Sequence, residues 1–190
     1  MEIKAHLPEN SISSTRAFFE NYKDSVFCGN IEKCDIYWAK SENDVPLFRT
    51  RLEKTDNEKR ILVTSKPLKK KEYKTEYNVE NEFCVGSSEW DRIIGFAKGL
   101  GLEICRRKWK KGFGFTVPVN GYIIHAEILE VKFLGWFLEM EICAETEDSL
   151  DKEDAQSALF ELYDMTGLPK NLLEPTGYNK MLAATGHERG

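Results

Sequence analysis

The sequence predicts an α+β fold in which an antiparallel sheet of about eight strands is flanked by helices. Runs that alternate polar and apolar residues recur along the first 145 residues, and turn signals separate several of them. Helical periodicity is confined to three longer segments. This meander-like spacing is typical of an antiparallel sheet, and it fits both an open sheet with one solvent face and a sheet closed into a barrel.

The expected strands are alternating or β-branched runs between turn signals such as those at 44–46 and 56–58. They cover residues 2–7, 25–40, 47–53, 59–67, 72–85, 102–111, 113–131 with a break near 119–122, and 135–145. Residues 112–115 read GFGF and have no helix after them, so we expect a hairpin or a bulge there rather than a phosphate-binding loop.

Three helices are expected, at residues 11–22, 87–101 and 149–168. The first two begin with serine capping residues. The third has Ser149 as its expected N-cap, acidic residues in its first turn and Gly167 at its end. Because no linker or repeat interrupts the chain, we expect one domain over residues 1–190, with a core at 1–145 and a C-terminal helical segment at 149–183.

Composition excludes several classes of protein. Lys and Arg number 27 against 32 Asp and Glu, and the net charge of -5 argues against a general nucleic-acid or membrane-surface binder. No run approaches the roughly 18 apolar residues of a membrane span, and the N-terminal residues have no signal-peptide core, so a cytoplasmic location is expected. The five cysteines and three histidines lack the spacing of a zinc site.

Charged residues at a spacing of two recur in most of the expected strands, and this spacing puts their side chains on one face of a strand. In LGWFLEMEIC, residues 134–143, Glu139 and Glu141 lie opposite a face of large apolar residues. For one strand alone, a solvent-exposed face is the usual explanation. A closed interior could hold so many charges only with partners, because each desolvated ion is costly. Polyphosphate oxygens would satisfy the cations, and a divalent cation would satisfy the carboxylates.

The motifs along the chain resemble those of the CYTH family, the triphosphate tunnel metalloenzymes that include class IV adenylyl cyclases and thiamine triphosphatases. The most specific match is VKFLGWFLEMEI at 131–142, which is similar to the family pattern V-x-x-L-G-x-F-x-E-x-E. The other matches are Glu2 and Lys4 in the ExExK strand, Asp35 and Tyr37 in KCDIYW, FRTR at 48–51, VTSKP at 63–67, EYNVENEF at 76–83, CRRKWK at 105–110 and a weaker echo in TGYNKML at 176–182. Two departures are visible: the first Glu of ExExK has no counterpart, and Leu129 stands where many members have Asp.

The resemblance implies an eight-stranded antiparallel β-barrel that encloses a triphosphate tunnel. The catalytic residues that it implies are Lys4, Lys66, Glu76 and Glu80. The phosphate-binding residues that it implies are Lys4, Arg49, Arg51, Lys66, Arg106 and Lys108. It also implies a Mg²⁺ or Mn²⁺ ion bound by Glu2, Glu127, Glu139 and Glu141, where Glu127 is preferred because alternation puts it on the face of His125.

The function that the resemblance implies is that of a metal-dependent enzyme acting on a triphosphate-containing small molecule such as ATP, thiamine triphosphate or tripolyphosphate. Its partners would then include neither nucleic acid nor a membrane, and a homodimer is expected because family members are often dimeric. The KCDIYW motif favours a class IV adenylyl cyclase-like reaction, from ATP to cyclic AMP and pyrophosphate. The alternatives are an organic or inorganic triphosphatase, a non-catalytic polyphosphate or nucleotide-binding module, and a protein-binding scaffold with an open charged sheet.

Overall fold

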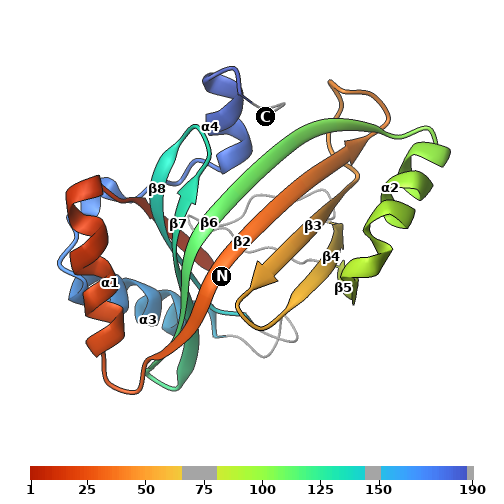
Figure 1. The fold of residues 1–190 in the computed structure, drawn as a ribbon. Coiled ribbons are helices and arrows are strands. Elements are labelled where there is room, and N and C mark those ends of the chain that lie inside the picture. Colours follow the sequence, from red (N-terminus) through yellow and green to blue (C-terminus); the bar gives the residue numbers. More distant parts are fainter. Residues whose placement is uncertain (66–80, 144–150, 188–190) are drawn as a thin grey trace.

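One curled antiparallel sheet forms the centre of the structure (Figure 1). The computed structural model describes residues 1–65, 81–143 and 151–187, and these supply eight strands in the order β1-β8-β7-β6-β2-β3-β4-β5. The strands are β1 (Glu2–His6), β2 (Val26–Ala39), β3 (Phe48–Thr55), β4 (Lys59–Ser65), β5 (Asn81–Gly86), β6 (Glu103–Val119), β7 (Tyr122–Val131) and β8 (Gly135–Glu141). The α+β class and the antiparallel sheet of eight strands are therefore confirmed.

Helices cover the two ends of this sheet. They are α1 (Ile12–Asn21), α2 (Trp90–Gly99), α3 (Lys152–Met165) and α4 (Tyr178–Ala184), with short 3-10 helices η1 (Glu9–Ser11), η2 (Ser87–Glu89) and η4 (Lys170–Leu172). In Figure 1, α1 and α3 lie at one end of the sheet and α2 lies at the other. Within the described ranges, no helix combines the length and the apolar character that a membrane span requires.

Alternation along the strands gives the sheet an apolar outer face. Under α1 and α3, Phe19 and Leu159 pack with Met140 of β8 in the main hydrophobic core. Under α2, Trp38 of β2 packs with Ala97, and both are fully buried. Because helices cover the apolar face, the opposite, charged face is left as the lining of the curl.

That charged inner face is largely buried from solvent. Seven of its ionisable residues are each at most 9% exposed: Lys4, Lys33, Asp35, Glu53, Lys108, Lys110 and Glu139. An open sheet with a solvent face would leave such side chains largely exposed, because charged groups are rarely buried unless they are paired. The structure therefore contradicts the scaffold alternative, in which the charges simply faced water.

The sheet curls without closing through hydrogen bonds in the described part of the chain. There, β1 and β5 are the two ends of the strand order, and they do not pair with each other. The free edge of β1 instead meets the segment before α4, where Ala5 forms a bridge with Leu173 and the Glu174 N–H donates to the Lys4 carbonyl at 2.9 Å. In place of the expected closed barrel, the described residues form a curled, tunnel-like sheet in which β1 and β5 are not joined by strand pairing.

Several boundaries differ from the sequence expectation. Strand β6 runs without interruption from Glu103 to Val119, so a hairpin at 112–115 is wrong. The bulge expected as the alternative is confirmed, because the register of β2 with β6 shifts between the pairs Phe27–Phe115 and Gly29–Gly114. Helix α3 begins after Asp151, whose carboxylate accepts hydrogen bonds from the Glu153 and Asp154 N–H groups, while the expected cap Ser149 lies outside the described residues. Of the expected strand 72–85, only the end is described, as β5.

The glycine at position 112 is required by close packing inside β6. A Cβ on Gly112 would lie 1.9 Å from the backbone oxygen of Ile128 in β7. We expect Gly112→Ala to lower the free energy of unfolding by about 3 kcal/mol, because a neighbouring strand must shift to admit the methyl group. Urea unfolding followed by circular dichroism measures this change.

The matched control is Gly95→Ala in α2, where a Cβ meets nothing within 4 Å. This control should leave the free energy of unfolding unchanged or raise it slightly, because alanine has a higher helix propensity than glycine. Equal stability of the two variants would contradict the close approach of β6 and β7.

Candidate functional site

Three neighbouring strands build a three-by-three grid of inward-facing polar side chains. The register of the central strand β2 with β3 places Tyr37, Asp35 and Lys33 opposite Arg49, Arg51 and Glu53, respectively. Its register with β6 places the same three residues opposite Arg106, Lys108 and Lys110. Because successive residues of a strand alternate between faces, all nine side chains point into the curl.

Asp35 holds the middle of the grid. It is fully buried, and its carboxylate accepts hydrogen bonds from Arg51 Nε at 2.6 Å and Arg51 Nη2 at 3.1 Å. Lys108 Nζ lies 3.2 Å from the same carboxylate and donates to the Tyr37 hydroxyl at 3.0 Å. Burial alone would raise the pKa of Asp35, but the charges of Arg51 and Lys108 hold it well below its usual range. Asp35 therefore fixes two of the predicted phosphate-binding cations in place.

Two further carboxylates reach the grid from β7 and β8. Lys110 Nζ donates to both oxygens of Glu139, at 2.7 and 2.8 Å, and Lys33 Nζ donates to both oxygens of Glu127, at 2.6 and 2.7 Å. Burial alone would raise the pKa of Glu139, but the charge and hydrogen bonds of Lys110 lower it to about 2. Burial lowers the pKa of Lys110 to about 8, even with Glu139 beside it. The Lys110 ammonium and the Glu139 carboxylate therefore each stabilise the charged form of the other.

Strand β1 adds a carboxylate and an ammonium group. Its register with β8 sets Glu2 opposite Glu141 and Lys4 opposite Glu139. Burial and the negative charge of Glu139 raise the pKa of Glu2, so these two carboxylates repel each other across the inner face. Glu141 is exposed and therefore lies at the rim.

Tyr178 enters the inner face from α4 and is only 6% exposed. Three ammonium groups surround its ring: Lys4 at 5.4 Å, Lys108 at 5.3 Å and Lys110 at 4.5 Å from the ring centroid. Burial and the nearby charge of Glu139 raise the pKa of Tyr178 well above its usual value. The hydroxyl is therefore a neutral donor.

The structure describes most of the predicted site residues and brings them to one face. The inner face carries Glu2, Lys4, Arg49, Arg51, Arg106, Lys108, Glu127, Glu139 and, at its rim, Glu141. The predicted residues Lys66, Glu76 and Glu80 lie outside the described residues. Lys33, Glu53 and Tyr178 were not predicted as site residues. For Lys33, the signal was its spacing of two from Asp35.

The described carboxylates fit a divalent cation in their chemistry but not as a ready-made cluster. No group of three His, Cys, Asp or Glu side chains among the described residues is placed to hold a metal ion. Of the four predicted ligands, Glu127 is paired with Lys33, and Glu139 is paired with Lys110. The repulsion between Glu2 and Glu139 is what a bound cation would relieve, so these two residues are the ones that would hold it.

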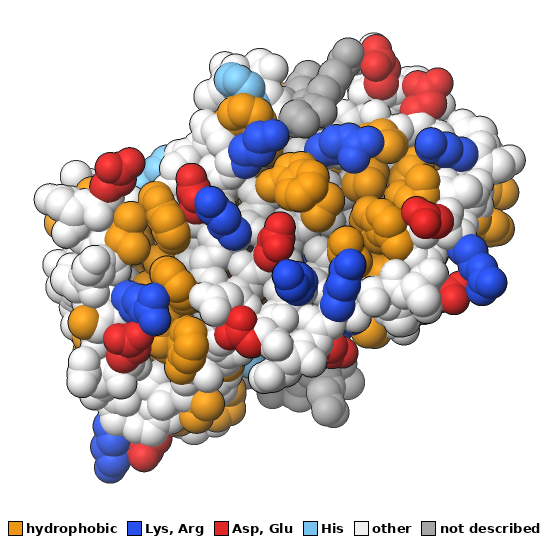
Figure 2. All heavy atoms as spheres, in the orientation of Figure 1, with side chains coloured by type: hydrophobic (Ala, Val, Ile, Leu, Met, Phe, Trp, Pro, Cys, Tyr) orange, Lys and Arg blue, Asp and Glu red, His pale blue; other side chains and the backbone are white. Residues whose placement is uncertain are grey.

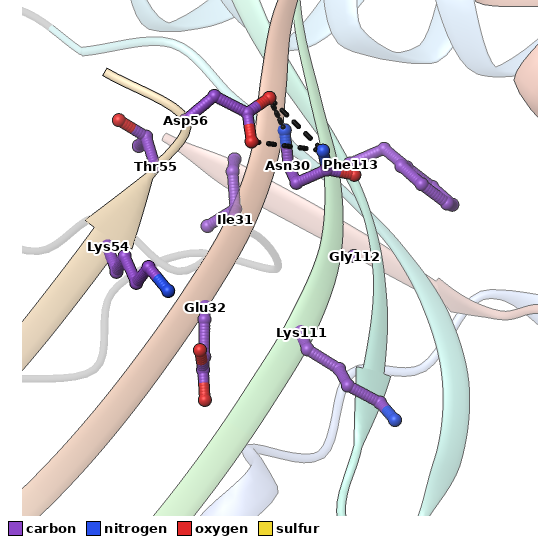
Figure 3. Close-up of a pocket in the computed structure, with 9 residues that line it drawn as sticks. All are labelled: Asn30, Ile31, Glu32, Lys54, Thr55, Asp56, Lys111, Gly112 and Phe113. Atoms are coloured by element: carbon purple, nitrogen blue, oxygen red, sulfur yellow. Dashed lines mark hydrogen bonds between the residues drawn. The ribbon is translucent and has the colours of Figure 1, made fainter. Parts of the chain in front are cut away.

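Among the described residues, the outer face carries no comparable cluster of buried charges. Figure 2 shows one face of the molecule on which cationic and acidic side chains are interspersed between two groups of hydrophobic ones, with no large area of a single sign. A groove of about 310 Å³ lies between the end of β3, residues 30–32 of β2 and residues 111–113 of β6, as drawn in Figure 3. Asp56 lines this groove and is exposed. Its carboxylate accepts hydrogen bonds from the N–H and the side chain of Asn30. The buried charges are on the inner face instead.

Comparison with known proteins shows a shared fold. No family model matches the chain, and no curated protein matches it. Among solved structures, a protein of Pyrococcus horikoshii OT3 is 20% identical, covers 97% of this chain and 98% of its own, and superposes with a TM-score of 0.74. A candidate adenylate cyclase of Vibrio parahaemolyticus is 15% identical, with 96% and 97% covered and a TM-score of 0.69. A candidate adenylyl cyclase of Hippeastrum with a dominant triphosphatase activity is 15% identical, with 97% and 95% covered and a TM-score of 0.58.

The chain has the fold of these proteins. The likeness extends over nearly the whole of each chain, including the C-terminal segment that carries Tyr178. The α+β fold with eight antiparallel strands that the CYTH resemblance implies is therefore confirmed, with a curled sheet that does not close within the described residues.

Proposed function

We propose that this protein is an enzyme that acts on a triphosphate-containing small molecule bound in the curl of the sheet. The observation that carries the proposal is the crowding of cations from β1, β2, β3 and β6 on one enclosed face. Lys4 and Arg106 form no ion pair within the described residues, so their charges are open to an external anion. A chain of phosphoryl groups is the ligand that matches several converging cations at once.

The cations would act as a clamp. Arg51 and Lys108, held by Asp35, would stabilise the negative charge that is spread over phosphoryl oxygens in the transition state. Glu2 and Glu139 would hold a Mg²⁺ or Mn²⁺ ion. When bound, this ion would supply further charge neutralisation on the phosphoryl group. The predicted roles of Lys66, Glu76 and Glu80 stay predictions.

Two reactions suit such a clamp. In the cyclase reaction, the 3′-hydroxyl of ATP attacks the α-phosphorus and pyrophosphate leaves. In the triphosphatase reaction, water attacks the terminal phosphorus and orthophosphate leaves. The Vibrio parahaemolyticus protein supports the first reaction, which the KCDIYW motif also favours. The Hippeastrum protein supports the second. The homodimer and the cytoplasmic location stay predictions.

A substrate screen tests the proposal. The purified chain is incubated with ATP, GTP, thiamine triphosphate or tripolyphosphate and Mg²⁺ or Mn²⁺, and orthophosphate, pyrophosphate and cyclic nucleotide are followed separately. Cyclic AMP with pyrophosphate identifies the cyclase, and orthophosphate alone identifies the triphosphatase. If nothing is turned over while tripolyphosphate raises the melting temperature, the binding-module alternative is correct. If tripolyphosphate neither reacts nor changes the melting temperature, the proposed function is wrong.

A further inference from the structure

Lys33 is a buried cation that the proposed reaction does not use. It lies on the inner face of β2, and its side chain is only 9% exposed. Its Nζ donates to both carboxylate oxygens of Glu127, at 2.6 and 2.7 Å, and lies 3.6 Å from the Glu53 carboxylate. One ammonium group is therefore within ion-pair distance of three oxygens from two carboxylates, an arrangement similar to that of carboxylate ligands around a hard metal ion.

The sequence of β6 allows Lys33 to reach Glu127. Strand β6 lies between β2 and β7 in the sheet, and its side chains alternate between the two faces. After Lys110, the next two inward positions of β6 are Gly112 and Gly114, and Gly114 lies opposite Glu127 in the register. Because glycine has no side chain, β6 places nothing on the inner face at these positions, and Lys33 meets Glu127 across it.

The cluster around Lys33 is balanced in charge. Arg60 donates hydrogen bonds to the Glu53 carboxylate at 3.0 and 2.7 Å, so two cations face two carboxylates. A divalent ion added here would bring two more positive charges beside a buried ammonium group, and the repulsion between like charges is strong where water is excluded. The Lys33 ammonium therefore opposes the binding of a metal ion at Glu127.

The carboxylates near β1 are not balanced in this way. Glu139 is paired with Lys110, but Glu2 forms no ion pair within the described residues. Burial and the negative charge of Glu139 raise the pKa of Glu2. Negative charge is therefore in excess at Glu2 and Glu139, whereas the charge of Glu127 is already neutralised.

We propose that Lys33 is a built-in counter-ion that keeps divalent ions away from Glu53 and Glu127, because its ammonium group occupies the position that such an ion would take between them. This inference rests on the proposed function, since it concerns the metal requirement of the same site. Unlike a metal ion, an ammonium group on a strand cannot dissociate, so the positive charge beside Glu127 is present at any metal concentration. The ion of the proposed function is then held by Glu2 and Glu139, and Glu127 is not one of its ligands.

The test compares Lys33→Met with the control Lys111→Met. Methionine keeps most of the length of the side chain but removes its charge. Lys111 is exposed on the outer face of β6, where its Nζ lies 3.0 Å from the Glu130 carboxylate, so the control also removes the cation of a lysine–glutamate pair. Mn²⁺ bound per chain is counted by electron paramagnetic resonance without tripolyphosphate. The melting temperature of each protein is measured in EDTA and in Mn²⁺.

We expect Lys33→Met to bind one more Mn²⁺ per chain than the wild type does. Its melting temperature should fall in EDTA, because two carboxylates have lost their counter-ion, and should recover in Mn²⁺. The double variant Lys33→Met, Glu127→Gln should bind no additional Mn²⁺, and in EDTA it should melt above Lys33→Met because both partners of the ion pair are gone. Lys111→Met should match the wild type in both measurements.

Three results would overturn the inference. Equal Mn²⁺ counts for the wild type and Lys33→Met would show that the ammonium group keeps no ion away. An additional Mn²⁺ in the double variant would mean that the ion binds elsewhere than at Glu127. A Lys33→Met chain that is unfolded in both EDTA and Mn²⁺ would show that the charge of Lys33 is structural alone.

These outcomes are separate from a failure of the proposed function. A wild type that does not bind tripolyphosphate counts against the proposed function. The Mn²⁺ count of Lys33→Met is taken without tripolyphosphate, so it decides the role of Lys33 in either case.

Discussion

Replacing Asp35 with Asn should lower the free energy of unfolding by about 3–5 kcal/mol, the usual cost of removing one partner from a buried ion pair. Asp35 is fully buried and is the shared anionic partner of Arg51 and Lys108. An asparagine keeps the size of the side chain but leaves two buried cations without a counter-charge. Urea unfolding at pH 7 measures the loss.

The control for this prediction is Asp91→Asn, on the exposed surface of α2. It removes the same charge from the chain but should change stability far less, because an exposed carboxylate contributes little. A stability of Asp35→Asn close to that of the wild type would show that the grid does not depend on its central anion.

The same substitution predicts a pH dependence. The pKa of Asp35 is held well below its usual range in the folded state, so its contribution to stability is fully present above the unfolded pKa of about 4. The contribution is lost as the pH falls through the folded pKa. The difference in unfolding free energy between wild type and Asp35→Asn should therefore be constant from pH 7 to about pH 5 and shrink below about pH 4. A difference that stays constant to pH 3 would mean that folding does not lower the pKa of Asp35.

The strands could be predicted from sequence because their period of two survives in the fold. Alternation placed Arg49 and Arg51, or Glu139 and Glu141, on one face, and the structure keeps each pair there. At 112–115 the expected bulge is present in the pairing of β2 with β6, but the expected hairpin was wrong for a physical reason. Glycines there allow the close approach of Ile128 and Ile31 within a continuous strand, whereas glycine in a sequence is read as a break.

The ion pairs of the site could not be predicted from sequence in the same way. Lys33 meets Glu127 across 94 positions of the chain, and this pairing depends on how β2, β6 and β7 are aligned. Alternation fixes the face of a side chain but not its neighbour on the next strand. The position of Tyr178 on the inner face could not be predicted from strand alternation at all, because Tyr178 lies on a helix near the C-terminus.

Replacing Glu139 with Gln should reduce kcat on the best substrate of the screen by at least a hundredfold. Glu139 is one of the two carboxylates that would hold the divalent cation, and a neutral amide is a much weaker ligand for a hard cation. In the presence of EDTA, tripolyphosphate binding should instead become tighter. The reason is that the variant removes a negative charge from the anion site and frees Lys110 from its partner.

These opposite changes separate a role in turnover from a general loss of structure. Steady-state kinetics at saturating substrate measure kcat, and calorimetry in EDTA measures the affinity for tripolyphosphate. The matched control is Glu130→Gln in β7, whose carboxylate lies 3.0 Å from Lys111 and is partly exposed on the outer face. This control should keep both properties of the wild type. If Glu139→Gln keeps the wild-type kcat, Glu139 holds no catalytic cation, and its carboxylate serves only to pair with Lys110 inside the curl.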